Sequence, residues 1–135
     1  MRESDKQTLT VAAVCFSDDH QRILTVRKSD TRMFMFPGGK LEAGEDATAA
    51  AIREVDEEIG IRLTADDLML VGTFRAPAAN ETDTMISATV FSSRLPAIPI
   101  ASAEIAELRW VHRTDTGADL APLLRDHVFP VMNAR

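Results

Sequence analysis

The segment Phe36–Ile61, FPGGKLEAGEDATAAAIREVDEEIGI, constrains the fold more than any other part of the chain. Seven of the seventeen positions from 42 to 58 are acidic: Glu42, Glu45, Asp46, Glu54, Asp56, Glu57 and Glu58. Apolar residues three and four apart predict a helix over Glu45–Ile59. Gly60 is a typical residue for ending such a helix. The segment therefore indicates a turn that leads into one amphipathic helix.

Three glutamates gather on one side of this predicted helix. At about 100° per residue, Glu57 and Glu58 fall roughly 60° and 40° to either side of Glu54. Like charges three and four residues apart each cost about a few tenths of a kcal/mol in an isolated helix. We therefore expect an exposed acidic face beside a core face. A solvated surface is one interpretation of it, and a cluster of carboxylates for Mg²⁺ or Mn²⁺ is the other.

The residues before the helix favour the metal interpretation. Gly38 and Gly39 form a turn in which the backbone can approach a ligand closely, and their carbonyl groups could join a coordination sphere. Gly44 allows a second turn immediately before the helix. A turn of this kind next to an acidic helix face predicts a site that combines backbone and carboxylate oxygens.

The rest of the chain mixes strands with a second helix. Strands are predicted over Leu9–Phe16, Arg22–Arg27, Leu68–Phe74, Thr84–Ser92 and Ile105–Val111. The polar turn Ser17–Gln21 predicts a hairpin between the first two strands. Met33–Phe36 is a short apolar segment that Pro37-Gly38-Gly39 ends. A terminal helix is predicted over Asp119–Met132, with Asp119 near its N-cap, and the layer rule then favours a sheet with helices on both faces.

Composition limits the classes of function. The 135 residues suit one domain over 1–135, and the net charge of −6 argues against a broad basic surface for nucleic acid or an anionic membrane. The N-terminal MRESDKQTLT has no apolar signal core, and the best apolar run is too short to span a bilayer. The single cysteine, Cys15, is expected in the core. These features predict a cytoplasmic protein.

The acidic segment resembles the Nudix box, G-x5-E-x7-R-E-U-x-E-E-x-G-U, where U is a bulky aliphatic residue. Every specified position is filled over residues 39–61: Gly39, Glu45, Arg53, Glu54, Val55, Glu57, Glu58, Gly60 and Ile61. Phe36-Pro37-Gly38 before the box and the late strand segment Glu104–Val111 fit the family as well. The resemblance implies the Nudix fold, an α/β (α+β) domain in which a mixed β-sheet is sandwiched between α-helices.

The resemblance also implies a reaction and a metal site. Nudix enzymes hydrolyse a nucleoside diphosphate linked to another moiety, with Mg²⁺ or in some cases Mn²⁺. Carried over to this chain, Glu57 and Glu58 are the principal side-chain metal ligands, and Gly38 offers a backbone carbonyl. Glu54 binds a metal or orients and deprotonates the attacking water. Glu107 matches by position an additional metal ligand of some family members, and Glu104 is the alternative.

Basic residues complete the expected site. By the same resemblance, Arg53 holds the carboxylates in place and Glu45 steadies the junction between loop and helix. Arg27 and Lys28 end a predicted strand where several relatives hold substrate phosphates, and Lys40 follows the first glycine of the box. For each of these three, a phosphate contact and a solvated position are both open.

The substrate that the resemblance implies is a small nucleoside diphosphate derivative, and we expect nucleoside triphosphates slightly ahead of ADP-ribose and sugar nucleotides. Thr114–Arg125 lacks the Asn with which the mutator-type enzymes read oxidised guanine, which argues against 8-oxo-dGTP. Ser92–Ala103 lacks the carboxylate that ADP-ribose-cleaving members often carry. A non-catalytic nucleotide-sensing module is a rival, but it would be expected to have a degenerate box. An isomerase of isoprenoid diphosphates ranks last, because Cys15 lies far upstream. A homodimer is compatible with the sequence.

Overall fold

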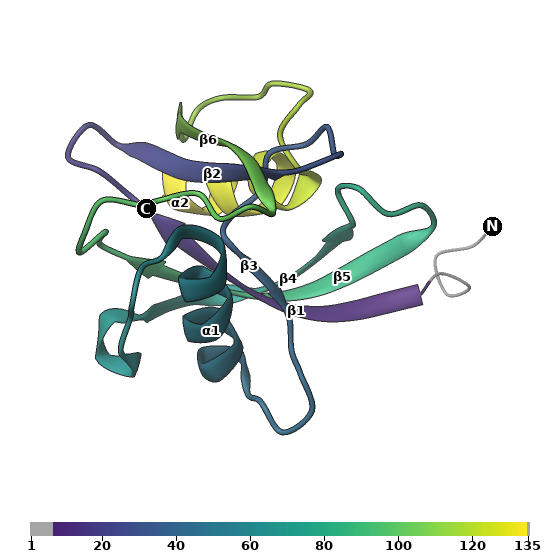
Figure 1. Ribbon diagram of the computed structural model, residues 1–135. Helices are drawn as coiled ribbons and strands as arrows, with labels where there is room; N and C mark the ends of the chain where they lie inside the picture. The colour runs from purple at the N-terminus through teal and green to yellow at the C-terminus, as the bar shows by residue number, and fades with distance from the viewer. Residues whose placement is uncertain (1–6, 135) are drawn as a thin grey trace.

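The computed structural model describes residues 7–134 and contains two sheets (Figure 1). The strands of the larger sheet, in spatial order, are β3 (Gly38–Lys40), β1 (Gln7–Phe16), β5 (Thr84–Ser93) and β4 (Met69–Pro77). β1 runs parallel to β5 and antiparallel to β3, and β4 is antiparallel to β5. The second sheet pairs β2 (Arg22–Lys28) with β6 (Ile105–His112) in antiparallel register. The sheets are thus mixed, as expected.

Capping residues within its own segment set both ends of α1 (Ala47–Ile59). The helix starts after Asp46, whose side chain accepts a hydrogen bond of 2.8 Å from the backbone N–H of Ala49. It ends at Gly60, which adopts the left-handed conformation at φ 69° and donates its N–H to the Asp56 carbonyl. The expected helix is therefore confirmed, apart from its first two residues.

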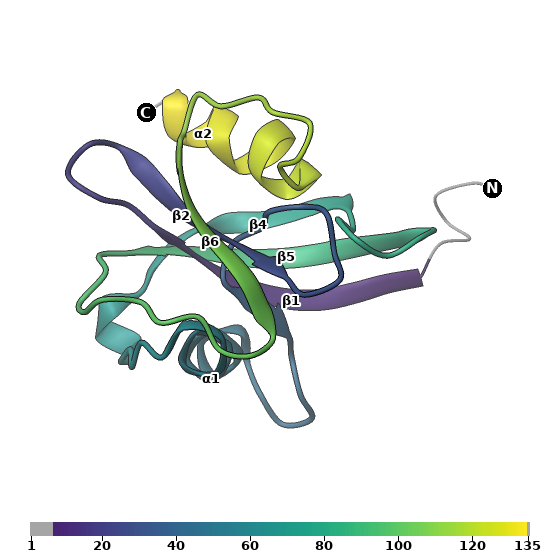
Figure 2. The ribbon, with the colours of Figure 1, turned by 45° about the horizontal axis from the view of Figure 1, so that its top comes forward.

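The C-terminal helical region lies on the opposite side of the larger sheet from α1 (Figure 2). It consists of η3 (Leu123–Val128), which has π-helical hydrogen bonds, and α2 (Phe129–Asn133). A short 3-10 turn, η2 (Ala65–Asp67), joins α1 to β4. The expected arrangement of a sheet between helices is confirmed.

Each face of β1 supplies one of two hydrophobic cores. Ala12, Val14 and Phe16 are buried against the α1 side, together with Val55 and Ile59 of that helix. Ala13 and Cys15 point to the other face, where the core includes Leu124 and Phe129 of the C-terminal region. Cys15 is fully buried, and burial raises the pKa of its thiol to about 12, as befits a core residue.

The predicted hairpin is wrong in its pairing. The chain turns between β1 and β2, where Ser17 and Ile23 form an isolated bridge, but the two strands then enter different sheets. β1 instead pairs along its whole length with β5 in parallel, from Gln7 opposite Thr84 to Phe16 opposite Ser93. Its second half, Ala12–Phe16, is buried on both faces. The short apolar segment Met33–Phe36 forms only isolated bridges, and the strand starts at the glycines that were expected to end it.

The terminal helix starts later than predicted. Phe34 forms a parallel bridge with Leu120, donating its N–H to the Asp119 carbonyl and accepting from the Ala121 N–H. The Asp119 carbonyl and the Ala121 N–H are therefore bonded to Phe34, and the helical region begins only after them. The Asp119 carboxylate binds Arg109 at 2.6 Å and caps nothing.

No helix within residues 7–134 is long and apolar enough to cross a membrane. The N-terminal segment that was expected to carry no signal sequence includes residues 1–6, which lie outside the described residues.

Candidate active site

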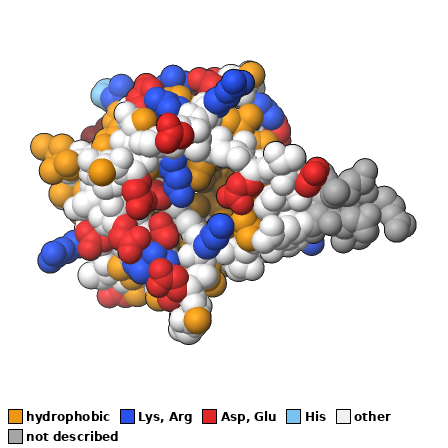
Figure 3. All heavy atoms as spheres, turned by 45° about the vertical axis from the view of Figure 1, so that its right-hand side comes forward, with side chains coloured by type: hydrophobic (Ala, Val, Ile, Leu, Met, Phe, Trp, Pro, Cys, Tyr) orange, Lys and Arg blue, Asp and Glu red, His pale blue; other side chains and the backbone are white. Residues whose placement is uncertain are grey.

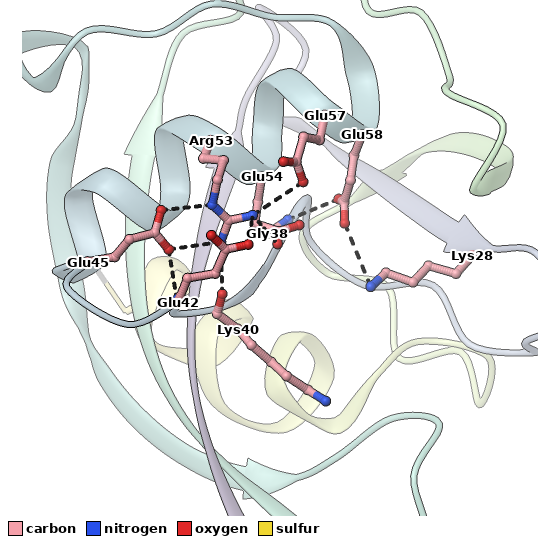
Figure 4. A network of polar contacts seen from close by, with 9 residues as sticks. All are labelled: Lys28, Gly38, Lys40, Glu42, Glu45, Arg53, Glu54, Glu57 and Glu58. Atoms are coloured by element: carbon pink, nitrogen blue, oxygen red, sulfur yellow. Dashed lines mark hydrogen bonds and ion pairs between the residues drawn. The ribbon is translucent and has the colours of Figure 1, made fainter.

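Arg53, on the second turn of α1, connects the helix to the loop before it (Figure 4). Its guanidinium donates to Glu45 through Nε at 2.7 Å and through Nη2 at 2.9 Å. Nη2 also reaches the Lys40 carbonyl at 3.0 Å, which ties the helix to the end of β3. The hydrogen bonds from Arg53 hold the pKa of Glu45 down at about 2, so Glu45 is ionised at neutral pH. Glu45 in turn accepts from the Glu42 N–H at 2.8 Å, which fixes the loop.

The same guanidinium holds two further carboxylates. Arg53 Nη1 lies 2.8 Å from Glu54 Oε1 and 3.2 Å from Glu57 Oε2. The Glu54 side chain is 16% exposed and that of Glu57 is 57% exposed. Arg53 therefore contacts the carboxylates that it was expected to hold, and it also contacts Glu42 at 3.5 Å, a partner that the sequence did not suggest.

Glu54 lies against the backbone of β3. A Cβ atom added to Gly39 would stand 2.5 Å from the Glu54 Cδ, closer than side chains ever approach. Gly39 is therefore required so that the Glu54 carboxylate can reach the strand. At Gly38, where φ is 153°, an added Cβ would collide with the Ala12 carbonyl oxygen at 2.1 Å. The two glycines bring backbone and carboxylate together, as their positions in the sequence indicated.

Glu58 is not on the exposed acidic face that we expected. Its side chain is 1% exposed, because β3 and Lys28 cover that side of α1. One carboxylate oxygen, Oε1, accepts from the Gly38 N–H at 3.1 Å. The other, Oε2, has no hydrogen-bond partner among the described residues, and Lys28 Nζ lies 3.8 Å from it. Burial raises the pKa of Glu58 to about 7, against the opposing effects of the Gly38 hydrogen bond and Lys28.

These residues fit a hard divalent cation. The donors are carboxylate oxygens, and a buried carboxylate with an unpartnered oxygen calls for a positive charge. As the side chains stand, no three His, Cys, Asp or Glu groups within residues 7–134 are gathered into a ready metal site. The reason is that Glu54 and Glu57 are turned toward Arg53 while Glu58 is turned toward Gly38. To bind a cation together, Glu54 and Glu57 would have to turn away from Arg53, and Glu58 would have to turn away from Gly38.

A cavity of about 460 Å³ opens beside this network. Gly38, Gly39 and Glu54 line it where it meets the carboxylates, and Lys28 and Lys40 line it as well. Its other walls include Leu9, Met35, Ile86, Leu123 and Asn80. In Figure 3, acidic and basic side chains gather beside a hollow with hydrophobic side chains at its base. A volume of this size suits a small molecule that carries both a charged and an apolar part.

The expected phosphate-binding residues divide into two groups. Lys28 and Lys40 line the cavity, although Figure 4 shows the Lys40 ammonium pointing away from the carboxylates. Arg27 does not line it; its guanidinium donates to the Thr31 carbonyl at 2.9 Å and lies 3.7 Å from Glu107. The aromatic residues Phe34 and Trp110 are both outside the cavity lining.

Glu107 is also absent from the cavity lining, and its carboxylate faces Arg27 and Arg109. Glu104 is the residue of this segment whose charge contributes to raising the pKa of Glu58. Glu104, the alternative that the sequence left open, therefore acts electrostatically on the buried carboxylate.

The apolar wall and Asn80 were missed from the sequence. They come from five separate segments, which only the sheet pairing brings together. Glu81 also lines the cavity.

Known proteins with the same fold share this arrangement of elements. The MutT protein from Methanosarcina mazei Go1 superposes with a TM-score of 0.79 at 23% identity, covering 97% of this chain and 99% of that one. The dihydroneopterin triphosphate pyrophosphohydrolase of E. coli gives 0.72 at 23% identity, with 95% and 99% covered. At such identities the likeness concerns the fold alone.

Sequence relatives and a family model agree with the fold. The 8-oxo-dGTP diphosphatase of Proteus vulgaris is 41% identical over 69 residues, which are 48% of this chain and 62% of that protein. The dihydroneopterin triphosphate diphosphatase of Escherichia coli (strain K12) is 34% identical over 67 residues, 49% of this chain and 45% of that protein. The chain thus spans about half to two thirds of the length of these curated relatives. The model of the NUDIX domain matches residues 6–131, nearly the whole chain, and the protein therefore belongs to the Nudix family.

Proposed function

We propose that this protein is a Mg²⁺-dependent pyrophosphohydrolase that cleaves nucleoside triphosphates, with Mn²⁺ as an alternative cation. The observation that supports this most is the position of Glu54, which belongs both to the carboxylate network and to the cavity wall. A substrate in the cavity would place its phosphates beside Gly38 and Gly39, next to the Glu58 and Glu54 carboxylates that contact these two glycines. Two relatives have names that specify triphosphates, 8-oxo-dGTP and dihydroneopterin triphosphate, which favours this class over sugar nucleotides.

The carboxylates and one carbonyl would hold the cation. Nudix hydrolases generally use divalent metal ions. In this chain Glu57, Glu58 and the Gly38 carbonyl would be the ligands, joined by Glu54 and by Glu107 or Glu104. When bound, a divalent cation neutralises the diphosphate, orients it and lowers the pKa of coordinated water. Glu58 Oε2, buried and without a hydrogen-bond partner within the described residues, is the oxygen that a bound cation would compensate most.

The chain's own side chains would do the rest of the work. Glu54 would accept a proton from the attacking water, and Arg53 would fix the direction of that carboxylate. Glu45 would hold Arg53, through the two hydrogen bonds described above. Lys28 and Lys40 would bind substrate phosphates from the cavity wall, and Arg27 would stay a more distant support. Positioning and charge stabilisation of this kind account for most catalysis of phosphoryl transfer.

Glu54→Gln tests the assignment of the base. The substitution keeps the shape of the side chain but removes its basicity, so kcat should fall by about 100-fold or more. Glu42→Gln is the matched control, because Glu42 also contacts Arg53 but is 67% exposed and does not line the cavity. A kcat of Glu54→Gln within about threefold of the wild type, less than 1 kcal/mol of barrier, would reject Glu54 as the base. Glu81 and Glu107 would then be the next candidates.

The reaction itself is tested with a panel of substrates in the presence of Mg²⁺ or Mn²⁺. Nucleoside triphosphates, ADP-ribose and nucleotide sugars would each be incubated with the protein, and the products identified by mass. We expect a monophosphate and pyrophosphate from the triphosphates. Preferential cleavage of ADP-ribose would support the alternative substrate class, and binding without cleavage across the whole panel would support a nucleotide-sensing module.

A further inference from the structure

The cavity extends along β1, away from the carboxylates. Gly38 pairs with Ala13, whereas Ile86, which lines the far part, pairs with Leu9. These two points on β1 are four residues apart, or roughly 13 Å at about 3.3 Å per residue. The backbone N–H of Ala78 donates to the Thr84 carbonyl, which places the start of the β4–β5 connection at this far end. The cavity is thus long enough to take more of a substrate than its phosphates.

The walls between the two ends are apolar. Leu9, Val11, Met35, Ile86 and Leu123 line this part of the cavity. Apolar walls of this kind can pack against the faces of a heterocycle, and a few polar groups then set its orientation. Apart from the residues near the glycines, the polar side chains of the described lining are Thr31, Asn80 and Glu81.

Asn80 presents a hydrogen-bond donor. Its Oδ1 accepts from the Met33 N–H at 3.3 Å, which directs the amide nitrogen the other way. That nitrogen, Nδ2, has the Met35 sulfur as its partner at 3.7 Å, and a thioether is a weak acceptor. The Asn80 amide can therefore donate a stronger hydrogen bond to a ligand carbonyl.

Glu81, the next residue, presents acceptors only. It is exposed, and it makes no hydrogen bond or ion pair with any other residue of the range 7–134. It is the second carboxylate of the cavity lining, after Glu54. A carboxylate can accept two parallel N–H groups at once, and such paired bonds are both strong and directional.

We propose that Asn80 and Glu81 select a base that carries a 2-amino-4-oxopyrimidine ring, as found in guanine and in pterins. This inference rests on the proposed function and specifies its substrate. The ring places a carbonyl beside a ring N–H and an amino group. Asn80 would donate to the carbonyl, while Glu81 would accept from both N–H donors. Adenine and cytosine offer only one donor beside an acceptor, so they would leave half of the Glu81 carboxylate unused.

The test compares substrates that differ in one group. dITP lacks the 2-amino group of dGTP, and dihydroneopterin triphosphate carries the same edge on a pterin. We expect the wild type to show a kcat/KM for dGTP at least about tenfold above those for dITP and dATP, as the loss of a charged hydrogen bond implies. In Glu81→Gln this preference should shrink to within about threefold, and Asn80→Ala should lower kcat/KM for dGTP and the pterin. The ratio of dGTP to dihydroneopterin triphosphate distinguishes the two sources of the ring.

Asp83→Asn is the matched control for Glu81→Gln. It makes the same change of carboxylate to amide two residues away, lies outside the cavity lining, and has a left-handed φ of 52° that Asn tolerates. Its selectivity should equal that of the wild type. Equal kcat/KM for dGTP and dITP in the wild type, or a selectivity unchanged in Glu81→Gln, would overturn the proposal while leaving hydrolysis intact.

Binding of the monophosphates separates this proposal from the proposed function. Calorimetry with dGMP and dIMP needs no hydrolysis. A protein that cleaves no triphosphate, yet binds dGMP more tightly than dIMP and loses the difference in Glu81→Gln, would contradict the hydrolase and support the base assignment. Equal or undetectable binding of the two monophosphates would reject the base assignment.

Discussion

Glu58 illustrates how one buried charge can serve a site. It lies on α1 among core residues, with one oxygen bound to the Gly38 N–H and the other near Lys28. A buried carboxylate without full compensation destabilises the protein. The fold therefore contains a group whose charge is costly until a cation arrives. We had expected Glu58 on an exposed face. Because its carboxylate is buried instead, Glu58→Gln should leave the melting temperature of the metal-free protein level or raise it.

The metal-free protein should lose stability as the pH rises because of Glu58. The folded state holds this proton more tightly than the unfolded chain, so the unfolded state is favoured increasingly between pH 4.5 and about 7. A displacement of the pKa from 4.5 to about 7 corresponds to roughly 3 kcal/mol at most. Urea denaturation in EDTA at pH 5 and pH 8 measures the loss. Glu58→Gln should lose less stability over this interval than the wild type, and parallel losses in the two proteins would contradict the prediction.

Sequence periodicity predicted only part of this residue's environment. The helical repeat correctly placed Glu54, Glu57 and Glu58 on one side of α1. Which of them is buried depends on what packs there, and β3 and Lys28 reach Glu58 from other parts of the chain. The contacts of Arg53 with Glu45 and Glu57, by contrast, lie within one helix and its preceding loop. Local contacts of this kind can be expected from a motif, whereas burial by distant segments cannot.

At the scale of elements, β3 is a strand built around two glycines so that a helix can contact its backbone. Gly39 and Gly44 both belong to the segment before α1, but they are needed for different reasons. Gly39 leaves room for the Glu54 carboxylate, whereas Gly44 has a φ of 82° and nothing within 4 Å of an added Cβ. Gly39 is therefore needed for the position of Glu54, whereas Gly44 is needed for the left-handed backbone conformation of the loop.

Two alanine substitutions should separate these roles. In Gly39→Ala the new methyl group would displace Glu54, so kcat should fall by about tenfold or more, in line with loss of a positioned base. Gly44→Ala should lower the free energy of unfolding by about 1 kcal/mol through backbone strain, while kcat stays near that of the wild type. Thermal unfolding and turnover of both variants would be measured together. Equal loss of activity in the two variants would mean that Gly39 serves the loop conformation alone.

Elements fixed by local signals were predicted better than those fixed by distant pairing. The predicted helix matched α1 within two residues because Asp46 and Gly60 cap it from within the segment. The predicted hairpin failed because β1 pairs with β5 rather than with β2. The terminal helix was predicted too early because Asp119 and Ala121 bond to the Phe34 backbone before the helical region begins. In each failure the deciding partner lies more than fifty residues away in the sequence.

At the scale of the whole molecule, the site joins parts that pack into different cores. α1 packs on one face of β1 and the C-terminal helical region on the other. The carboxylates come from the first layer, whereas Leu123 and Leu124 of the cavity wall come from the second. β1 and β3 connect these layers, so a ligand that bridges the carboxylates and the cavity would fasten one layer to the other. The homodimer that the sequence allowed stays a prediction.

A divalent cation should therefore stabilise the whole fold. Binding to the native state alone raises the free energy of unfolding by RT ln(1 + [L]/Kd), about 2.7 kcal/mol when the cation concentration is 100 times Kd. Melting temperatures would be recorded over a series of Mg²⁺ concentrations in protein first treated with EDTA. The rise should disappear in the Glu57→Gln, Glu58→Gln double variant, because two of the proposed ligands are then neutral.

Asp56→Asn is the matched control, since Asp56 is exposed on the same helix and is absent from the network around Arg53. This variant should keep the full Mg²⁺ response. Glu58 gives the test a second arm: its charge is costly without the cation and useful with it. Glu58→Gln should therefore be at least as stable as the wild type in EDTA at pH 8, and less stable than the wild type in saturating Mg²⁺. Such a crossing of the two stabilities requires the cation to act at Glu58, whereas an identical Mg²⁺ response in the wild type and the double variant would place the cation elsewhere on the protein.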